Sequence, residues 1–161
     1  MSEGPNGYQD SRPGHERPDH SDSDGPEGDP LAWYQRGLEL LSRGSPAAAA
    51  QILERAATAE PSSRSVREAL ARAQFDARRY AEAADNFRLI VEASPADDYA
   101  HFGLGLSLAR SGDPASAAEY LALAAAMRPD QNHYTNALLQ VRATLHSRSG
   151  RPDRDQPRED S

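Results

Sequence analysis

The sequence predicts an all-α solenoid, in which helix–turn–helix repeats stack one after another. The main observation is a period of about 34 residues that recurs through three copies without an insertion or a gap. The second is that most recurring residues are small or apolar, as expected where neighbouring helices pack closely. The positions that follow the period are Pro61, Pro95 and Pro129; Gly37, Ala71 and Gly105; Ala49, Ala83 and Ala117; Leu53, Phe87 and Leu121; and Ala56, Ile90 and Ala124.

Residues that begin and end helices mark the individual elements. A capping side chain precedes proline at Asp29-Pro30, Ser45-Pro46 and Asp113-Pro114, the usual arrangement at a helix N-terminus. Gly44 and Gly112 stand where a helix ends in a left-handed residue. With the period, these signals predict helix pairs at 30–43 with 46–59, 64–77 with 80–93 and 97–111 with 114–127, and a final helix at about 131–146.

Small residues predict the closest contacts between helices. Gly37 and Gly105 lie midway along the first helix of a pair, where glycine costs about 1 kcal/mol relative to alanine. Keeping glycine there indicates a contact that even a methyl group would disturb. Leu53, Phe87 and Leu121, on the second helices, are expected to fill the space between pairs.

The last predicted helix continues the register once and then departs from it. Leu138 lies one period beyond Leu104, but Leu139 stands where Gly105 supplies the small residue. No further partner helix is therefore expected, and the helix is interpreted as a cap with a polar outer face. Its apolar face consists of Tyr134, Leu138, Val141 and Leu145.

The domain is predicted to span residues 30–146, between two tails of different composition. Residues 1–29 hold eight acids and two arginines, a net charge of −6 out of −7 for the chain. They are rich in Gly, Pro, Ser, Asp and Glu, so they lack the apolar surface that offsets chain entropy, and we expect an acidic disordered tail. Residues 147–161 are interpreted in the same way. Within the domain we expect repeats at 30–63, 64–97 and 98–131 and a capping helix at 132–146.

This pattern resembles the tetratricopeptide repeat family, whose repeat reads W-x2-L-G-x2-Y followed by Ala, Phe, Ala and Pro. The resemblance covers residues 30–146. Arg36 departs from it where Leu is usual, and Arg67 and His101 stand where copy one has Trp33. The matches are Trp33, Gly37, Leu40, Ala49, Leu53, Ala56 and Pro61 in copy one; Leu70, Ala71, Tyr80, Ala83, Phe87, Ile90 and Pro95 in copy two; and Leu104, Gly105, Leu108, Ala117, Leu121, Ala124 and Pro129 in copy three.

The resemblance implies a concave groove lined by the first helix of each pair. Its apolar and aromatic side chains suit an amphipathic helix or an extended apolar segment of a partner, with Arg72 taking an acidic or carbonyl group. In the alternative interpretation, several of these side chains only pack between neighbouring helices and Arg72 pairs with Glu68 one turn away. The expected partner-binding residues are Tyr34, Leu38, Glu68, Arg72, Phe75, Tyr99, Phe102 and Leu106.

The best-known groove chemistry of this family is a clamp of Lys, Arg and Asn side chains that holds the terminal carboxylate of a chaperone tail. None of the corresponding residues in this chain is Lys or Arg, so none can donate a charge-assisted hydrogen bond. We therefore expect no carboxylate clamp. These corresponding residues are Tyr34, Leu38, Ala69, Tyr99 and Gly103.

Composition argues against several other classes of function. The chain has no Cys, which excludes disulfides and thiolate metal sites, and no apolar run near the roughly 18 residues of a membrane span. Its acidic start lacks a signal sequence, so the expected location is the cytoplasm. The chain has no basic patch of the kind that binds nucleic acid, so no nucleic-acid partner is expected. All 18 basic residues are Arg, which together with the many alanines indicates a GC-rich, actinobacteria-like genome.

Catalytic and cofactor motifs are weak. Gly103-Leu-Gly105 matches the start of a dinucleotide fingerprint, but it lies within a predicted helix and follows no strand, so packing explains it. His101, His133 and His146 share no metal-ligand spacing. We therefore expect no catalytic, cofactor or metal site, and a non-catalytic adaptor that binds a protein or peptide. The alternative is a structural protein that associates with itself into homo-oligomers.

Overall fold

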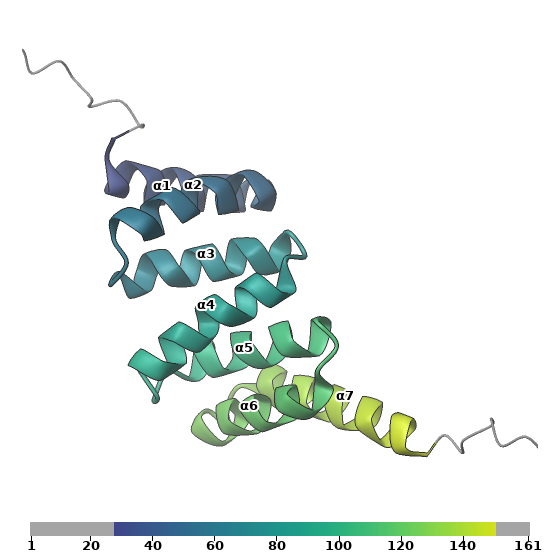
Figure 1. The fold of residues 1–161 in the computed structure, drawn as a ribbon. Helices are drawn as coiled ribbons and strands as arrows, with labels where there is room; N and C mark the ends of the chain where they lie inside the picture. Colours follow the sequence, from purple (N-terminus) through teal and green to yellow (C-terminus); the bar gives the residue numbers. More distant parts are fainter. Residues whose placement is uncertain (1–27, 151–161) are drawn as a thin grey trace, which may run out of the picture.

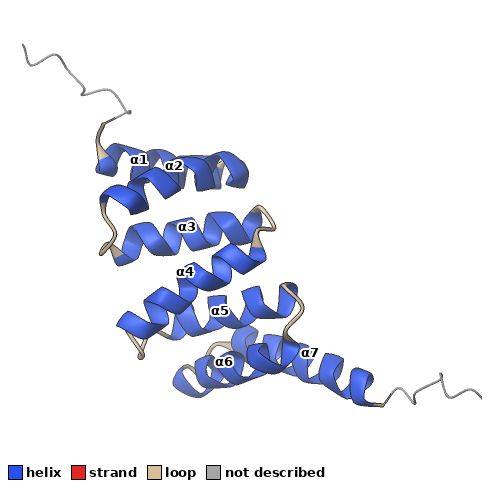
Figure 2. Ribbon diagram, viewed as in Figure 1, coloured by secondary structure: helices blue, strands red, loops and turns tan. Residues whose placement is uncertain are grey.

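The structure, a computed structural model, describes residues 28–150, and most of both predicted tails lies outside them. The described chain contains seven helices and no strand (Figures 1 and 2). The predicted boundaries of the first six helices are each within one residue of those observed. The helices are α1 (Pro30–Ser42), α2 (Pro46–Ala59), α3 (Arg64–Asp76), α4 (Tyr80–Ala93), α5 (Asp98–Arg110), α6 (Pro114–Met127) and α7 (Asn132–Ser149).

The helices form a stack in which each packs against the next (Figure 1). The first helices of successive pairs also touch, since α1 contacts α3, α3 contacts α5 and α5 contacts α7. Over residues 28–150 no such contact joins α2 to α4 or α4 to α6. The layer of first helices is therefore the tighter one, and it forms the inner side of a curved solenoid. The predicted solenoid of three helix pairs and a terminal helix is confirmed.

The predicted helix starts and turns are present, with one correction and one addition. The correction is Ser45, whose side chain forms no cap hydrogen bond although α2 begins at Pro46 as predicted. Side chains of Asp29 and Asp113 accept hydrogen bonds of 3.0 and 3.1 Å from backbone amides of the helices they cap. Gly44 and Gly112 have the predicted positive φ values of 73° and 95°. Arg78, at the matching position of copy two, has φ of 63°. The period of the sequence thus extends to backbone conformation, and copy two adopts the left-handed turn without glycine.

Close contacts explain the glycines inside helices. A Cβ atom added to Gly37 would lie 2.4 Å from Leu53 Cγ, and one added to Gly105 would lie 2.6 Å from Leu121 Cγ. The prediction that a methyl group would disturb these contacts is confirmed. At Gly103 the added atom would lie 2.5 Å from the Phe87 ring, so packing, not nucleotide binding, accounts for Gly103 as well.

Copy two also joins its helices through a pair of amides, one buried and one half-buried, at positions that are apolar in copy one. Asn86 donates a hydrogen bond of 2.7 Å to Gln74, which is buried, and accepts one of 2.9 Å from Arg67. The equivalent positions in copy one are Leu40 and Ile52. Because buried polar groups are costly without partners, the two amides stabilise the fold only as a pair.

The two ends of the stack are closed differently. On α1, Arg36 and Glu39 form an ion pair of 2.8 Å at positions that are buried and apolar or small in later copies, such as Leu70. This explains the Arg36 departure, because the outer face of a first repeat meets solvent. On α7, Leu139 is 56% exposed, and no partner helix covers it among the described residues.

The end of α7 corrects one predicted boundary. The helix continues to Ser149, whereas the prediction ended it at 146 and assigned 147–161 to a tail. Residues 147–149 contain neither Gly nor Pro, and the Ser147 hydroxyl donates a hydrogen bond of 3.0 Å to the Ala143 carbonyl. The helix ends only before Gly150.

Candidate binding groove

The inner side of the stack contains a pocket of about 250 Å³ between α3 and α5. Five of the eight residues predicted to bind a partner line it, and α4 contributes part of its surface. Side chains from three different helices therefore meet around one cavity. Its lining consists of Arg72, Phe75, Asp76, Phe87, Tyr99, Phe102, Gly103 and Leu106.

Gly103 allows an outer-layer side chain to reach the pocket. Phe87 belongs to α4 but packs directly against the backbone of Gly103, where any Cβ would collide with its ring. The Phe87 and Tyr99 rings then meet edge to face, with centroids 6.2 Å apart. The lining is therefore built from rings held by packing, which is a rigid form of apolar surface.

Charged groups surround Tyr99 at the pocket. Burial raises the pKa of the Tyr99 hydroxyl; Arg72 lowers it by charge attraction, while Glu68 and Asp76 raise it further. The hydroxyl therefore stays protonated at neutral pH and is a hydrogen-bond donor beside the apolar rings.

Arg72 and Glu68 do not form the predicted pair. Glu68 pairs instead with Arg64 at 2.7 Å, and Arg64 also reaches Asp97, the cap of α5, at 2.5 Å. Arg72 is exposed and forms no ion pair with any residue of the described chain. Glu68 pairs with Arg64 and not with Arg72 for a physical reason. Arg64 lies between the carboxylates of Glu68 and Asp97, and its charge is attracted by both.

Tyr34 and Leu38 lie apart from the pocket. Both pack against the core of the first repeat, which includes Leu53. Tyr34 also lines a separate cavity of about 260 Å³ with Leu31 and Val66. Neither residue lines the groove pocket, and their role in partner binding stays a prediction.

Aromatic residues of α7 pack against Phe102, which lines the pocket. Phe102 stacks on Tyr134 with ring centroids 4.5 Å apart and meets His133 edge to face at 5.2 Å. His133 lies one period beyond Tyr99, so the spacing of 34 residues could have predicted its position beside Phe102. Asp76 and Phe87 were also missed, because sequence spacing does not show that Gly103 opens a path between layers.

Comparison with known proteins identifies the family. A model described as "Tetratricopeptide repeat" matches residues 34–98 and 90–132, which together make up more than half of the chain. This chain belongs to the tetratricopeptide repeat family. No curated protein matches its sequence.

Solved structures with the same tetratricopeptide fold are distant in sequence. MamA residues 41–end from Desulfovibrio magneticus RS-1 has 21% identity and a TM-score of 0.71, over 75% of this chain and 68% of that one. The first tetratricopeptide domain of human RPAP3 has 19% identity and a TM-score of 0.69, over 80% and 100%. The first such domain of Spaghetti (RPAP3), bound to the HSP90 peptide SRMEEVD, has 18% identity and a TM-score of 0.68, over 73% and 93%. At these identities the likeness shows the fold alone.

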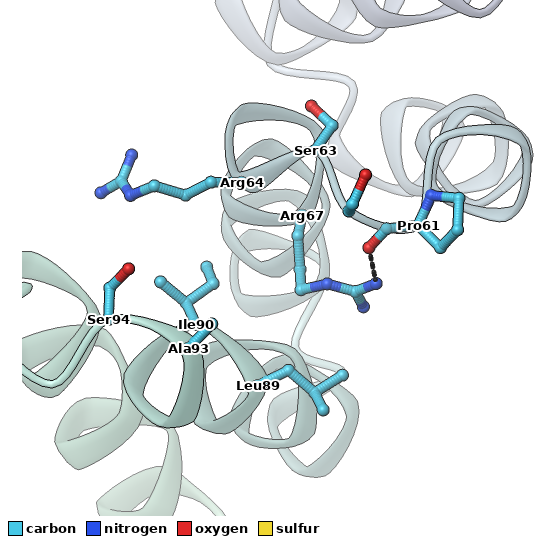
Figure 3. Close-up of a pocket in the computed structure, with 9 residues that line it drawn as sticks. Pro61, Ser63, Arg64, Arg67, Leu89, Ile90, Ala93 and Ser94 are labelled. Atoms are coloured by element: carbon cyan, nitrogen blue, oxygen red, sulfur yellow. Dashed lines mark hydrogen bonds between the residues drawn. The ribbon is translucent and has the colours of Figure 1, made fainter.

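A second cavity of this tetratricopeptide domain, of about 320 Å³, lies where the α2–α3 loop meets the last turns of α4 (Figure 3). Arg67 donates a hydrogen bond of 2.8 Å to the Pro61 carbonyl there, as Figure 3 shows. Arg64, the other cation of the lining, is paired with Glu68 and Asp97. Because both guanidinium groups are already bonded, this cavity is a weaker binding candidate than the groove pocket.

Within residues 28–150 of the domain, no group of three or more His, Cys, Asp or Glu side chains is placed to hold a metal ion. None of the seven described helices combines the length and the apolar character needed to cross a membrane.

Proposed function

We propose that this tetratricopeptide protein is a non-catalytic adaptor that binds a segment of a partner protein in the groove between α3 and α5. The observation that carries the proposal is the aromatic pocket on the inner side of the stack, in which the rings of Phe75, Tyr99 and Phe102 are only half-buried. An apolar concavity of this kind is a usual anchor site for an amphipathic helix or an extended segment.

The ligand class differs from that of the chaperone tail seen in one structural neighbour. The Spaghetti (RPAP3) domain is bound to a peptide that ends in EEVD. In this chain the clamp positions carry no Lys or Arg; Ala69 is buried, and Gly103 is packed against Phe87. An acidic C-terminal peptide therefore lacks its anchoring charges, and we expect an apolar or amphipathic internal segment instead.

The test compares two matched substitutions. Leu106→Asp places a charge in the pocket, and Leu139→Asp places the same charge on α7, where Leu139 is already 56% exposed. In affinity capture from native extract, a partner should be recovered with wild type and with Leu139→Asp but lost with Leu106→Asp. Circular dichroism first verifies that both variants are folded. Equal recovery by the two variants would rule out the groove as the binding surface.

Self-association is the second candidate, favoured by exposed apolar side chains on the outer helices. Leu89 on α4 and Leu123 on α6 are 46% and 47% exposed and lie one period apart, so the same face recurs in two repeats. We expect a homo-oligomer formed through this face to dissociate in a Leu89→Arg/Leu123→Arg variant. Sedimentation velocity over a hundredfold range of concentration tests it, and a wild-type monomer throughout that range excludes it.

A further inference from the structure

The rim of the groove pocket carries one positive and one negative side chain. Arg72 and Asp76 are one helical turn apart on α3, which places them about 6 Å apart along the helix axis. Both are exposed, and neither forms an ion pair within the described part of the chain. The pocket therefore presents two charges of opposite sign in a defined order.

The nearby charges do not cancel this arrangement. Glu68 pairs with Arg64, which also pairs with Asp97, and it forms no ion pair with Arg72 among the described residues. Arg110 lies over the Tyr80 ring at 6.0 Å and does not line the pocket. Arg72 is thus the cation that α3 offers to a ligand, and Asp76 is the anion one turn further on.

The size of the cavity limits what enters it. About 250 Å³ is below the roughly 300–1,000 Å³ typical of small-molecule and cofactor pockets, so it suits a single large side chain. The rings of Phe75, Tyr99 and Phe102 make that side chain an apolar one.

We propose that the pocket selects partner segments that carry one large apolar side chain with a carboxylate on the side facing Arg72 and a basic or neutral group on the side facing Asp76. This inference rests on the proposed function and narrows its ligand class. A segment with carboxylates on both sides would meet Asp76 and be repelled, so a uniformly acidic ligand is disfavoured. The opposite charges also fix the direction in which the segment lies along α3.

A charge exchange tests the proposal with a displayed library of short random peptides, panned on the full-length protein. Wild type should enrich peptides in which Leu, Met, Phe or Trp has an acidic residue on one side in the sequence. On the other side of that apolar residue, acids should be rare. Arg72→Glu/Asp76→Arg should enrich the reversed order. Asp85→Arg/Arg88→Glu, which exchanges an exposed pair on α4, should keep the wild-type preference.

Affinity of the best wild-type peptide is then measured by fluorescence anisotropy. We expect Arg72→Glu to weaken it at least tenfold and a peptide with lysine in place of the acid to recover most of that loss. One result would overturn this inference but keep the groove as the binding site. In that result the enriched peptides bind wild type and not Leu106→Asp, but their charges show no preferred order, or show the same order on the exchanged variant.

The remaining outcomes concern the groove itself. Peptides that bind wild type and Leu106→Asp equally overturn both the inference and the proposed function. If the only sequence bound is a synthetic copy of residues 1–27, the occupant is the acidic segment of this chain and the partner proposal is overturned.

Discussion

Gly105 and Leu121 provide the sharpest test of how this solenoid packs. Gly105→Ala gains about 1 kcal/mol in helix propensity. It also forces a Cβ atom to within 2.6 Å of Leu121 Cγ and 3.2 Å of the Ala117 carbonyl oxygen. Leu121 is fully buried, so we expect overpacking to cost about 2–3 kcal/mol, within the usual range. The free energy of unfolding should therefore fall by about 1–2 kcal/mol.

The second half of the test removes the obstacle. Leu121→Ala alone should cost about 2–5 kcal/mol, because it leaves a cavity in the core. In that background the Cβ of Gly105→Ala no longer meets a leucine, so the same substitution should become neutral or stabilising by up to about 1 kcal/mol. The favourable coupling between the two sites is then about 1–3 kcal/mol.

Urea unfolding followed by far-ultraviolet circular dichroism gives the four free energies of this double-mutant cycle. Ala143→Gly, at an exposed position inside α7, is the control for helix propensity and should cost about 1 kcal/mol. The reasoning is refuted if Gly105→Ala stabilises the wild type, or if the two substitutions add to within about 0.5 kcal/mol.

Three further experiments test the Asn86–Gln74 amide pair, the contact of Tyr134 with α5 and the polar outer face of α1. Asn86→Ala should cost about 1–3 kcal/mol in urea unfolding because it leaves Gln74 buried without its partner, whereas Gln74→Leu with Asn86→Ile should be nearly neutral. Burial, then a hydrogen bond to a carboxylate, raises the pKa of Tyr134 above its ordinary 10.0. The protonated Tyr134 hydroxyl therefore contributes fully to the free energy of unfolding at neutral pH, and this contribution is lost as the pH rises past about 10. Tyr134→Phe should reduce the decrease of the urea midpoint at alkaline pH. An unchanged decrease contradicts this. Arg36→Leu with Glu39→Ala should give α1 an apolar outer face and cause concentration-dependent association in sedimentation velocity. A monomer at all concentrations would count against the interpretation that this ion pair closes the N-terminal end of the stack.

The order and type of the helices could be predicted because the sequence repeats the same local requirements. Proline and capping residues restrict local backbone conformation, and glycine at Gly44 and Gly112 permits the left-handed turn. Arg78 shows the limit of that reasoning, since its backbone adopts the same turn without a residue that favours it. There the neighbouring helices impose the conformation, and only the period points to it.

The candidate site was predictable to the extent that it follows the period. Phe75, Tyr99, Phe102 and Leu106 were expected on the inner face, and the structure brings them around one pocket. Tyr34 and Leu38 satisfied the same rule but pack into the first repeat, because the helical face toward the groove also faces the neighbouring helix. Spacing alone does not separate these two uses of an apolar residue.

The sequence by itself determined the helices, their stacking order and the positions of closest approach, because these depend on local conformation and on a spacing repeated in every copy. Tertiary structure decided which charges remain available. Arg64 and Arg72 are both near Glu68 in sequence, yet Asp97 from the next repeat lies close enough to reinforce the Arg64 pair and leaves Arg72 at the pocket rim. It also decided that Phe87 passes Gly103 to reach the groove. Both outcomes depend on distances between residues of different repeats, which no single repeat contains.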